Sequence, residues 1–331
     1  MIRYICQRVL FAIPLLFAMT LLTFILMRLT PGNYFDSLKL NPQISGETIA
    51  RYEALYQLDK PVLWQYFCWV RNLGSGELGY SFYYNIPVGK ILSQRLGNTF
   101  LLAFAGLVFT WLAAIPLGIW AGLRRNRWGD RCVSVLSFFL LSTPAFFLAL
   151  LLLFFASHTG GLPLGGMVSA DFEQFSPELK LFDILRHLLI PTIVISLGAI
   201  AALQRIMRGN FLEVLGQQYI AAARARGLPE NVVIYRHALR NAINPLITLF
   251  GYELSGLLSG AALIEIICNW PGLGSLMLTA VRAKDIYLVM ASMLMGGILL
   301  LAGNLLADIL LVWSDPRIKE APDRSRGLTS R

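Results

Sequence analysis

The sequence predicts an all-α polytopic membrane protein with six transmembrane helices. Of its 331 residues, 56% are hydrophobic and only 14% are charged, whereas a soluble domain carries about 25% charged residues. The mean hydropathy is +0.62. The apolar residues lie in long blocks, and a block of about 18 or more predicts a membrane-spanning helix. This composition excludes intrinsic disorder, a coiled coil and most soluble enzymes.

The predicted spans cover residues 9–27, 99–123, 132–157, 188–203, 245–267 and 287–313. About 20 residues cross the hydrocarbon core at a rise of about 1.5 Å each, so the fourth span needs extra residues at its ends. Pro144 and Pro191 each remove a helix hydrogen bond, which predicts kinks in the third and fourth spans. The first block is longer than a signal peptide's apolar core and no A-x-A site follows it, so we interpret it as an uncleaved helix.

The distribution of Lys and Arg predicts the orientation. With a cytoplasmic N-terminus, the inner segments 1–8, 124–131, 204–244 and 314–331 hold 17 of the 28 basic residues. The outer segments, which are longer in total, hold the other 11. Cytoplasmic loops concentrate Lys and Arg, so both termini are expected in the cytoplasm. The net charge of +9 then reflects topology, and no nucleic-acid partner is expected.

No catalytic, cofactor or metal site is predicted. The four cysteines and three histidines stand singly along the chain, which argues against a disulfide framework or a metal cluster. The G-x-G-x-x-G sequence at 74–79 lacks the strand and helix of a dinucleotide site, and no G-x-x-x-x-G-K-[ST] loop occurs. If the protein uses ATP, another chain must bind it.

Four polar residues fall inside or at the ends of predicted spans: Glu253, Glu265, Asn304 and Asp308. A charge at the centre of a membrane helix costs roughly 2.5–3.5 kcal/mol on insertion scales. Such residues can line a substrate path or proton relay, or they can bond neighbouring helices together. We favour the second interpretation for Glu265 and Asp308, which lie near span ends, and leave both open for Glu253.

The inner segment 204–244 carries the most informative pattern. The alanine-rich run 221–225 favours a helix, and Gly227 suits the left-handed position just after a helix end. A second helix is predicted over about 229–241, with Pro229 at its start. A helix of about ten residues is marginal alone in water, so this element is a candidate docking site for a partner. An ordinary basic loop is the alternative.

This segment resembles the EAA loop of ATP-binding-cassette (ABC) importer permeases, whose pattern is E-A-A, three residues and G. Ala222, Ala223 and Gly227 match, while Ala221 replaces the glutamate. The run YIAAARARGL at 219–228 is similar to that of the first-subunit branch of the dipeptide, oligopeptide and nickel permeases. Further similarities follow in the family's order: TPG (30–32), LDKP (58–61), GELGYS (76–81), NT (98–99), IPLG (115–118), STPAF (142–146), LP (162–163), WPGLG (270–274), N-x-x-x-D (304–308) and DPR (315–317).

The resemblance implies a type I ABC importer permease fold. It divides the chain into an N-terminal membrane helix with an extracytoplasmic segment (1–97), a five-helix core containing the coupling loop (98–313) and a cytoplasmic tail (314–331). It also implies that Ala222, Ala223, Arg224 and Gly227 couple the spans to an ATPase.

The partners implied are a second permease, two ATPase subunits that hold ATP and magnesium, an extracytoplasmic binding protein and the bacterial cytoplasmic membrane. Family substrates include dipeptides, oligopeptides, nickel complexes and some sugars. We favour peptides because no His/Cys cluster points to metal handling. A secondary peptide transporter that needs no ATP is the alternative.

Overall fold

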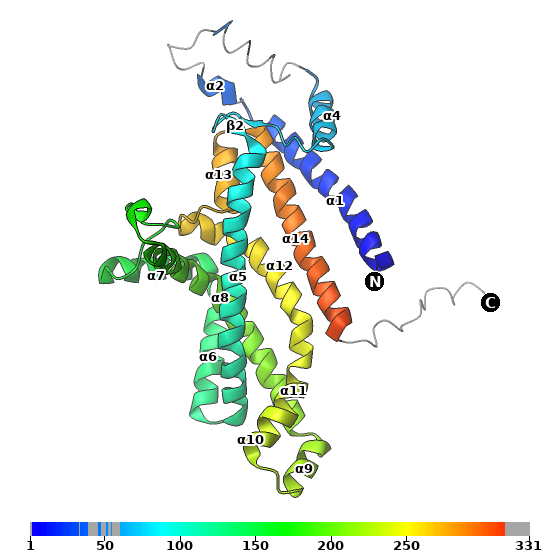
Figure 1. Ribbon diagram of the computed structural model, residues 1–331, viewed down its shortest axis with the longest axis vertical. Helices are drawn as coiled ribbons and strands as arrows, with labels where there is room; N and C mark the ends of the chain where they lie inside the picture. Colours follow the sequence, from blue (N-terminus) through cyan, green and yellow to red (C-terminus); the bar gives the residue numbers. More distant parts are fainter. Residues whose placement is uncertain are drawn as a thin grey trace, which may run out of the picture.

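The computed structural model describes residues 2–32, 34–38, 46–47, 51, 54 and 60–314, which form a bundle of long helices (Figure 1). Within these residues, five helices are long and apolar enough to cross a membrane, and the bent pair α6 (Trp128–Ser142) and α7 (Ala145–Thr159) supplies a sixth span if counted as one. The five are α1 (Ile2–Leu29), α5 (Val88–Leu123), α8 (Pro177–Leu215), α12 (Asn244–Ile267) and α14 (Ile286–Ser314). The predicted six-span helical architecture is confirmed, while the predicted tail lies outside the described residues after Ser314.

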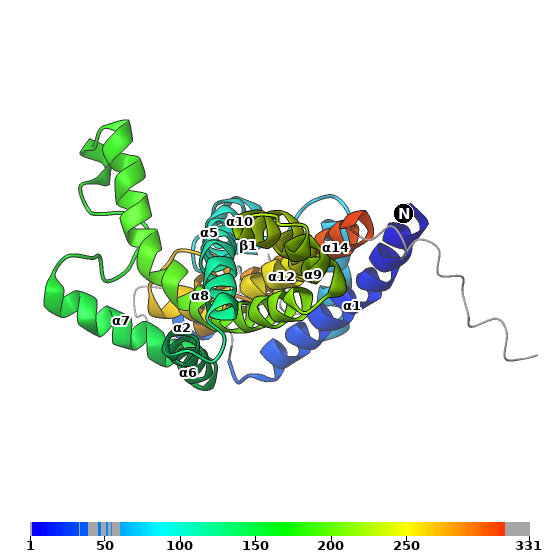
Figure 2. The same cartoon turned by 90° about the horizontal axis from the view of Figure 1, so that it is seen from below.

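The third predicted span is broken at Pro144, as its proline suggested. α6 and α7 meet at 107°, because the residue before a proline is pushed out of the helical region, and Thr143 is indeed extended with ψ 126°. α7 therefore leaves the line of the other helices and extends sideways (Figure 2). Pro191 behaves differently, since α8 continues through it.

α5 and α8 are much longer than the spans predicted at 99–123 and 188–203. Their 36 and 39 residues correspond to about 54 and 58 Å, against about 30 Å of hydrocarbon. Both helices therefore extend beyond the hydrocarbon core, and the boundary drawn at 97–98 falls inside α5. The two ends of α8 contain polar residues, so a hydropathy pattern does not recognise them as part of the helix. One of these polar residues, Asp183, accepts hydrogen bonds from Ser169, which precedes it by 14 residues, at 2.6 and 2.8 Å.

Small residues bring the long helices together. A Cβ atom at Gly118 would overlap Met207, and one at Gly122 would overlap Phe211, so α5 and α8 pack with their backbones close. Gly251 likewise lets α12 approach α14. Close approach through small residues replaces the hydrophobic effect as the source of helix association in a membrane. The inner half of α8 is thereby fixed against α5.

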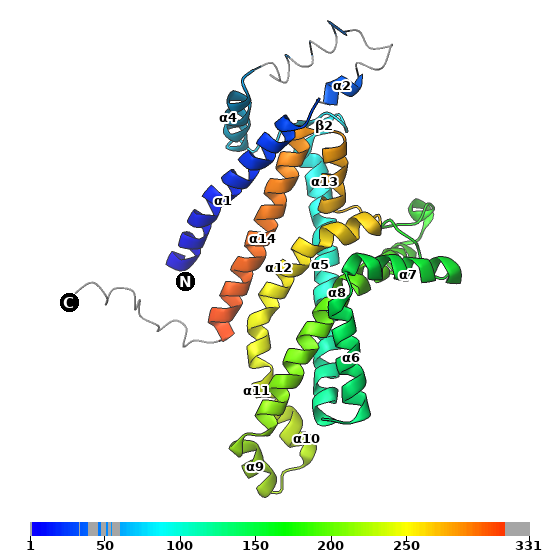
Figure 3. The ribbon, with the colours of Figure 1, turned by 180° about the vertical axis from the view of Figure 1, so that it is seen from behind.

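The two ends of the bundle carry different structures (Figure 3). The end with the shorter elements of the N-terminal region, which we term the outer end, has α2 (Tyr34–Leu38), α4 (Val62–Leu73), the antiparallel pair β1 (Tyr80–Ser81) and β2 (Ile86–Pro87), and α13 (Leu273–Arg282). A further short helix, η1 (Phe172–Gln174), precedes α8. Buried Phe35, Trp69 and Phe82 join these elements to Phe24 of α1 and Met290 of α14. The described part of the predicted segment 31–97 therefore folds onto the helix ends.

Candidate functional site

The opposite, inner end carries the predicted docking element. It consists of α9 (Gln218–Ala225), α10 (Glu230–Val232), the π-helical turn η2 (Val233–Ala238) and α11 (Leu239–Ala242). These elements connect the end of α8 to the start of α12 (Figure 1). The predicted helix–turn–helix is confirmed, although Pro229 is the N-cap of the second helix and not its first residue.

Gly227 ends the first helix in the predicted left-handed conformation, with φ +76°. Its amide donates to the Arg224 carbonyl at 2.9 Å, and the Leu228 amide donates to the Ala223 carbonyl at 3.4 Å. These two bonds form a Schellman cap, which satisfies carbonyls left unpaired at a helix end. No atom would lie within 4 Å of a Cβ here. The backbone conformation, and not lack of space, is therefore what favours glycine.

An ion pair braces the turn. Arg224 Nη2 lies 2.7 Å from Glu230 Oε1, and its Nε donates to Oε2 at 3.2 Å. The bidentate hydrogen bonds from the Arg224 guanidinium hold the pKa of the Glu230 carboxyl below its usual value. A second link joins α9 to α11, because Asn241 Nδ2 donates to the Tyr219 hydroxyl at 2.9 Å. The two helices are thus held at a fixed relative angle.

One face of α9 is anchored, and the other is exposed within the part of the chain that the structure describes. Ile220 and Ala223 are buried in a cluster that also contains Met207 and Phe211 of α8 and Val233 and Ala238 of η2. Ala221, Ala222 and Ala225 are exposed. The predicted coupling residues therefore have different positions. Ala222 faces outward, Ala223 packs inside, and Arg224 and Gly227 build the turn.

Glu265 is completely buried and organises the outer end. Its Oε1 accepts a hydrogen bond from Thr99 Oγ1 at 2.6 Å, and its Oε2 accepts from the amides of Gly274 and Ser275 at 2.7 and 3.3 Å. A carboxylate at the start of α13 is stabilised by the unpaired amides and by the helix dipole. A Cβ at Gly272 would overlap this carboxylate. The geometry supports a structural role for Glu265, in which its hydrogen bonds hold neighbouring helices together. Residues of the WPGLG motif at 270–274 pack around its carboxylate.

Asp308 is also paired. It is buried in α14, and its Oδ2 lies 3.2 Å from Arg8 Nη2 of α1. The ion pair joins the first and last membrane helices of the chain. Asn304, one turn earlier, lines a cavity of about 250 Å³ between the same two helices. Both residues therefore lie at the α1–α14 contact.

Glu253 differs from the other two carboxylates. It is half-buried on α12, and within the described residues it has no hydrogen bond or ion pair. The neighbouring Gly256 and Gly260 on the same helix are exposed. This part of α12 is thus uncovered in the single chain. No hydrogen bond or ion pair joins any two of the four predicted polar residues, all of which the structure describes.

No pattern in the sequence predicts which residues form hydrogen bonds with these groups. Thr99 stands out only as part of the NT similarity at 98–99, and no motif includes Glu230. Asp285, just before α14, is fully buried and accepts hydrogen bonds from Ser81 Oγ at 2.5 Å and the Tyr83 amide at 3.1 Å. Burial raises the pKa of Asp285, and these hydrogen bonds oppose the rise. It ties the β1–β2 hairpin to α14.

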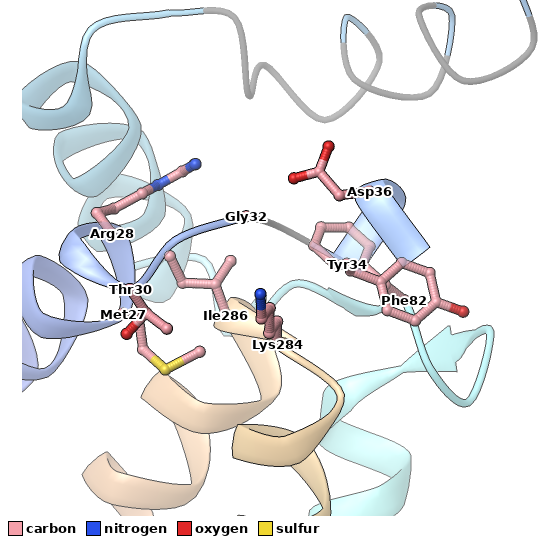
Figure 4. A pocket seen from close by; sticks show the side chains of 9 residues that line it. All are labelled: Met27, Arg28, Thr30, Gly32, Tyr34, Asp36, Phe82, Lys284 and Ile286. Carbon is pink, nitrogen blue, oxygen red and sulfur yellow. The ribbon is translucent and has the colours of Figure 1, made fainter. Parts of the chain in front are cut away.

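A hollow of about 260 Å³ lies at the outer end. Arg28 of α1, Asp36 of α2 and Lys284 from the turn before α14 surround it (Figure 4). The Lys284 ammonium donates to the Pro31 carbonyl, and Gly32 takes a left-handed φ of +79°. The TPG motif at 30–32 thus fastens the end of α1 to the turn between α13 and α14.

Comparison with known proteins covers almost the whole chain. Residues 114–320 match the model for the inner membrane component of binding-protein-dependent transport systems, and residues 1–103 match the model for its N-terminal region. A Brucella ovis protein described as a peptide permease is 38% identical over 96% of this chain and 99% of its own length. The oligopeptide transport system permease protein of Bacillus subtilis is 35% identical, and the dipeptide transport system permease protein of Alkalihalophilus pseudofirmus is 31% identical, each over 96% of this chain and its own full length.

Proposed function

Because this chain belongs to the family of inner membrane components of binding-protein-dependent transport systems, we propose that it is the permease subunit of an ATP-driven importer of dipeptides or oligopeptides. A second, similar permease completes the pathway. The peptide assignment rests on relatives that are named for peptide, oligopeptide and dipeptide transport. The chain itself holds no ATP, which the partner ATPase subunits bind together with magnesium.

The observation that carries the ATP-driven part is the two-faced helix α9. Its exposed face presents Ala222, and its buried face, through Ile220 and Ala223, is fixed to α8. A small-residue surface lets a partner's groove approach the backbone. A rigid base transmits the partner's motion to the spans. A secondary transporter has no need for such an element.

We place the binding protein at the outer end. The described elements at that end include α4, the β1–β2 hairpin and the turn that carries Lys284, beside which the hollow lies. Arg28 and Lys284 provide positive charge at this surface, and Asp36 provides negative charge. Both termini then face the cytoplasm, in line with the distribution of basic residues.

We assign Glu253 to the pathway, since it is the predicted membrane carboxylate that has no partner within the described chain. A charge left without a partner in a span is costly, and a water-filled path or a cationic peptide terminus would compensate it. The test is Glu253→Gln, which should reduce uptake while leaving assembly unchanged. Asp308→Asn is the matched control, because Asp308 forms part of the α1–α14 contact. Peptide uptake by the Asp308→Asn variant should stay largely intact. A normal rate for Glu253→Gln would contradict the assignment.

The whole proposal is tested by purifying the tagged chain from native membranes in a mild detergent. We expect ATPase subunits and a second permease to co-purify. In liposomes, ATP hydrolysis should rise when the binding protein is added with one class of peptide. A lone chain that moves peptide without ATP would favour the secondary transporter.

A further inference from the structure

A groove of about 570 Å³ runs between α6 and α8, and none of the site residues described above lines it. Phe138 and Leu141 of α6 and Ile206 of α8 form its apolar part. Arg205 and Arg208 of α8 form its basic part. An apolar wall suits the acyl chains of an anionic lipid, and a cationic end suits its headgroup.

The two arginines differ in their partners. Arg208 is neutralised, because its Nε and Nη2 donate to the Asp130 carboxylate at 2.6 and 2.7 Å. The Arg205 guanidinium instead lies 4.5 Å from the centre of the Phe138 ring. No carboxylate of the described residues lies within ion-pair distance of Arg205, and the residue is exposed. The groove therefore keeps one uncompensated positive charge.

The depth of the groove also points to a lipid. Arg205 lies two residues after the predicted fourth span, and α6 begins at Trp128, within the basic segment 124–131. In the orientation proposed above, this is the cytoplasmic interface of the membrane. The inner leaflet carries the anionic lipids, and basic pockets between helices on that side suit their headgroups. The aliphatic stem of an arginine can follow the acyl region while its head reaches the interface.

We propose that this groove binds an anionic phospholipid of the inner leaflet, with its phosphate on Arg205 and an acyl chain along Phe138, Leu141 and Ile206. The inference uses the proposed orientation and does not depend on which substrate is transported. It adds a lipid site to a subunit whose proposed function concerns peptides.

The test measures the thermal unfolding midpoint of the purified, delipidated complex while phosphatidylglycerol is titrated into detergent. Arg205→Gln removes the headgroup contact. The matched control is Arg124→Gln, since Arg124 stacks on Trp120 at 4.6 Å near the same end but lies outside the groove. Loss of a charge-assisted contact should weaken phosphatidylglycerol binding at least about tenfold in Arg205→Gln. Binding to the wild type and Arg124→Gln should be equal.

A second variant, Ala202→Phe, fills the groove without changing charge and should also weaken binding. Equal binding by Arg205→Gln and wild type would overturn the proposal. So would equal stabilisation by phosphatidylcholine, which would mean no preference for anionic lipid. Glycerol 3-phosphate acting as strongly as the lipid would indicate a site for a free anion. Cross-linking of Ser134→Cys to the second permease would show that a subunit fills the groove.

Discussion

Gly227 follows α9 at the point where the chain turns, and we expect its left-handed φ of +76° to help set the angle of the exposed helix. An L-residue in this conformation costs roughly 1–2 kcal/mol, and a β-branched side chain is the least suited to it. Gly227→Val should therefore preserve the membrane bundle but disturb the turn. We expect peptide uptake to fall and ATP hydrolysis to lose its dependence on peptide.

The control for this prediction is Gly227→Asn, because asparagine tolerates the left-handed region better than other non-glycine residues. Uptake by this variant should lie between those of the wild type and the valine variant. Wild-type uptake by Gly227→Val would mean that the Schellman cap does not set the coupling geometry.

Glu265 shows how a buried carboxylate can be structural. Three donors, from Thr99, Gly274 and Ser275, converge on it. Glu265→Gln keeps the shape but replaces one acceptor oxygen by an NH₂ group that must face a donor. Hydrogen bonds to a charged group are worth about 1.5–3 kcal/mol, so the thermal midpoint of the purified complex should fall by several degrees. The exposed Glu77 of the outer loop supplies the control, Glu77→Gln, which should unfold like the wild type. An unchanged midpoint for Glu265→Gln would rule out this bonding role.

At the scale of the element, α9 has an exposed face, which is the proposed docking face, and a buried face that is anchored to α8. Ala222 is exposed, and Ala223 is 7% exposed within the cluster around Phe211 and Val233. Ala222→Leu should block the partner's approach while the chain remains stable. Ala223→Leu should overpack the cluster and destabilise the chain by about 1–3 kcal/mol.

The two variants are distinguished by measuring ATPase co-purification and the yield of the chain separately. We expect Ala222→Leu to lose the ATPase at normal yield, and Ala223→Leu to lose yield first. Full ATPase recovery with Ala222→Leu would place the docking surface elsewhere.

The sequence predicted this helix and its glycine cap but not which alanine faces inward. In a run of alanines, no periodic pattern of apolar and polar residues shows which face of the helix is buried. The buried face is instead the one that meets Met207 and Phe211 of α8. Hydropathy found α12 and α14 within a few residues, because they are uniformly apolar. It missed the ends of α8, where Asp183 and Arg208 are paired with groups distant in the sequence. A hydropathy pattern along the chain does not show which residues form such pairs in the folded protein.

At the scale of the whole molecule, the break at Pro144 illustrates the same limit. The proline predicts an interruption, but the 107° angle between α6 and α7 depends on contacts that follow from the packed bundle. α7 packs on α8 and α12 through Ala149 and Ala156, which share a buried cluster with Ile190 and Ile264. The sideways course of α7 therefore could not be read from sequence.

The arrangement of the bundle makes a last prediction about sidedness. The helices α4 and α9 lie at opposite ends of the molecule (Figure 1). Ser75 follows α4 and Arg226 follows α9, and both residues are exposed. Basic residues concentrate near the end that carries Arg226, so that end should face the cytoplasm. In right-side-out vesicles of a cysteine-free chain, an impermeant maleimide should label Ser75→Cys at once and Arg226→Cys only after the membrane is opened. The reverse pattern would place α9 outside the cell, where no ATPase could reach it, and the ATP-driven mechanism would fail with it.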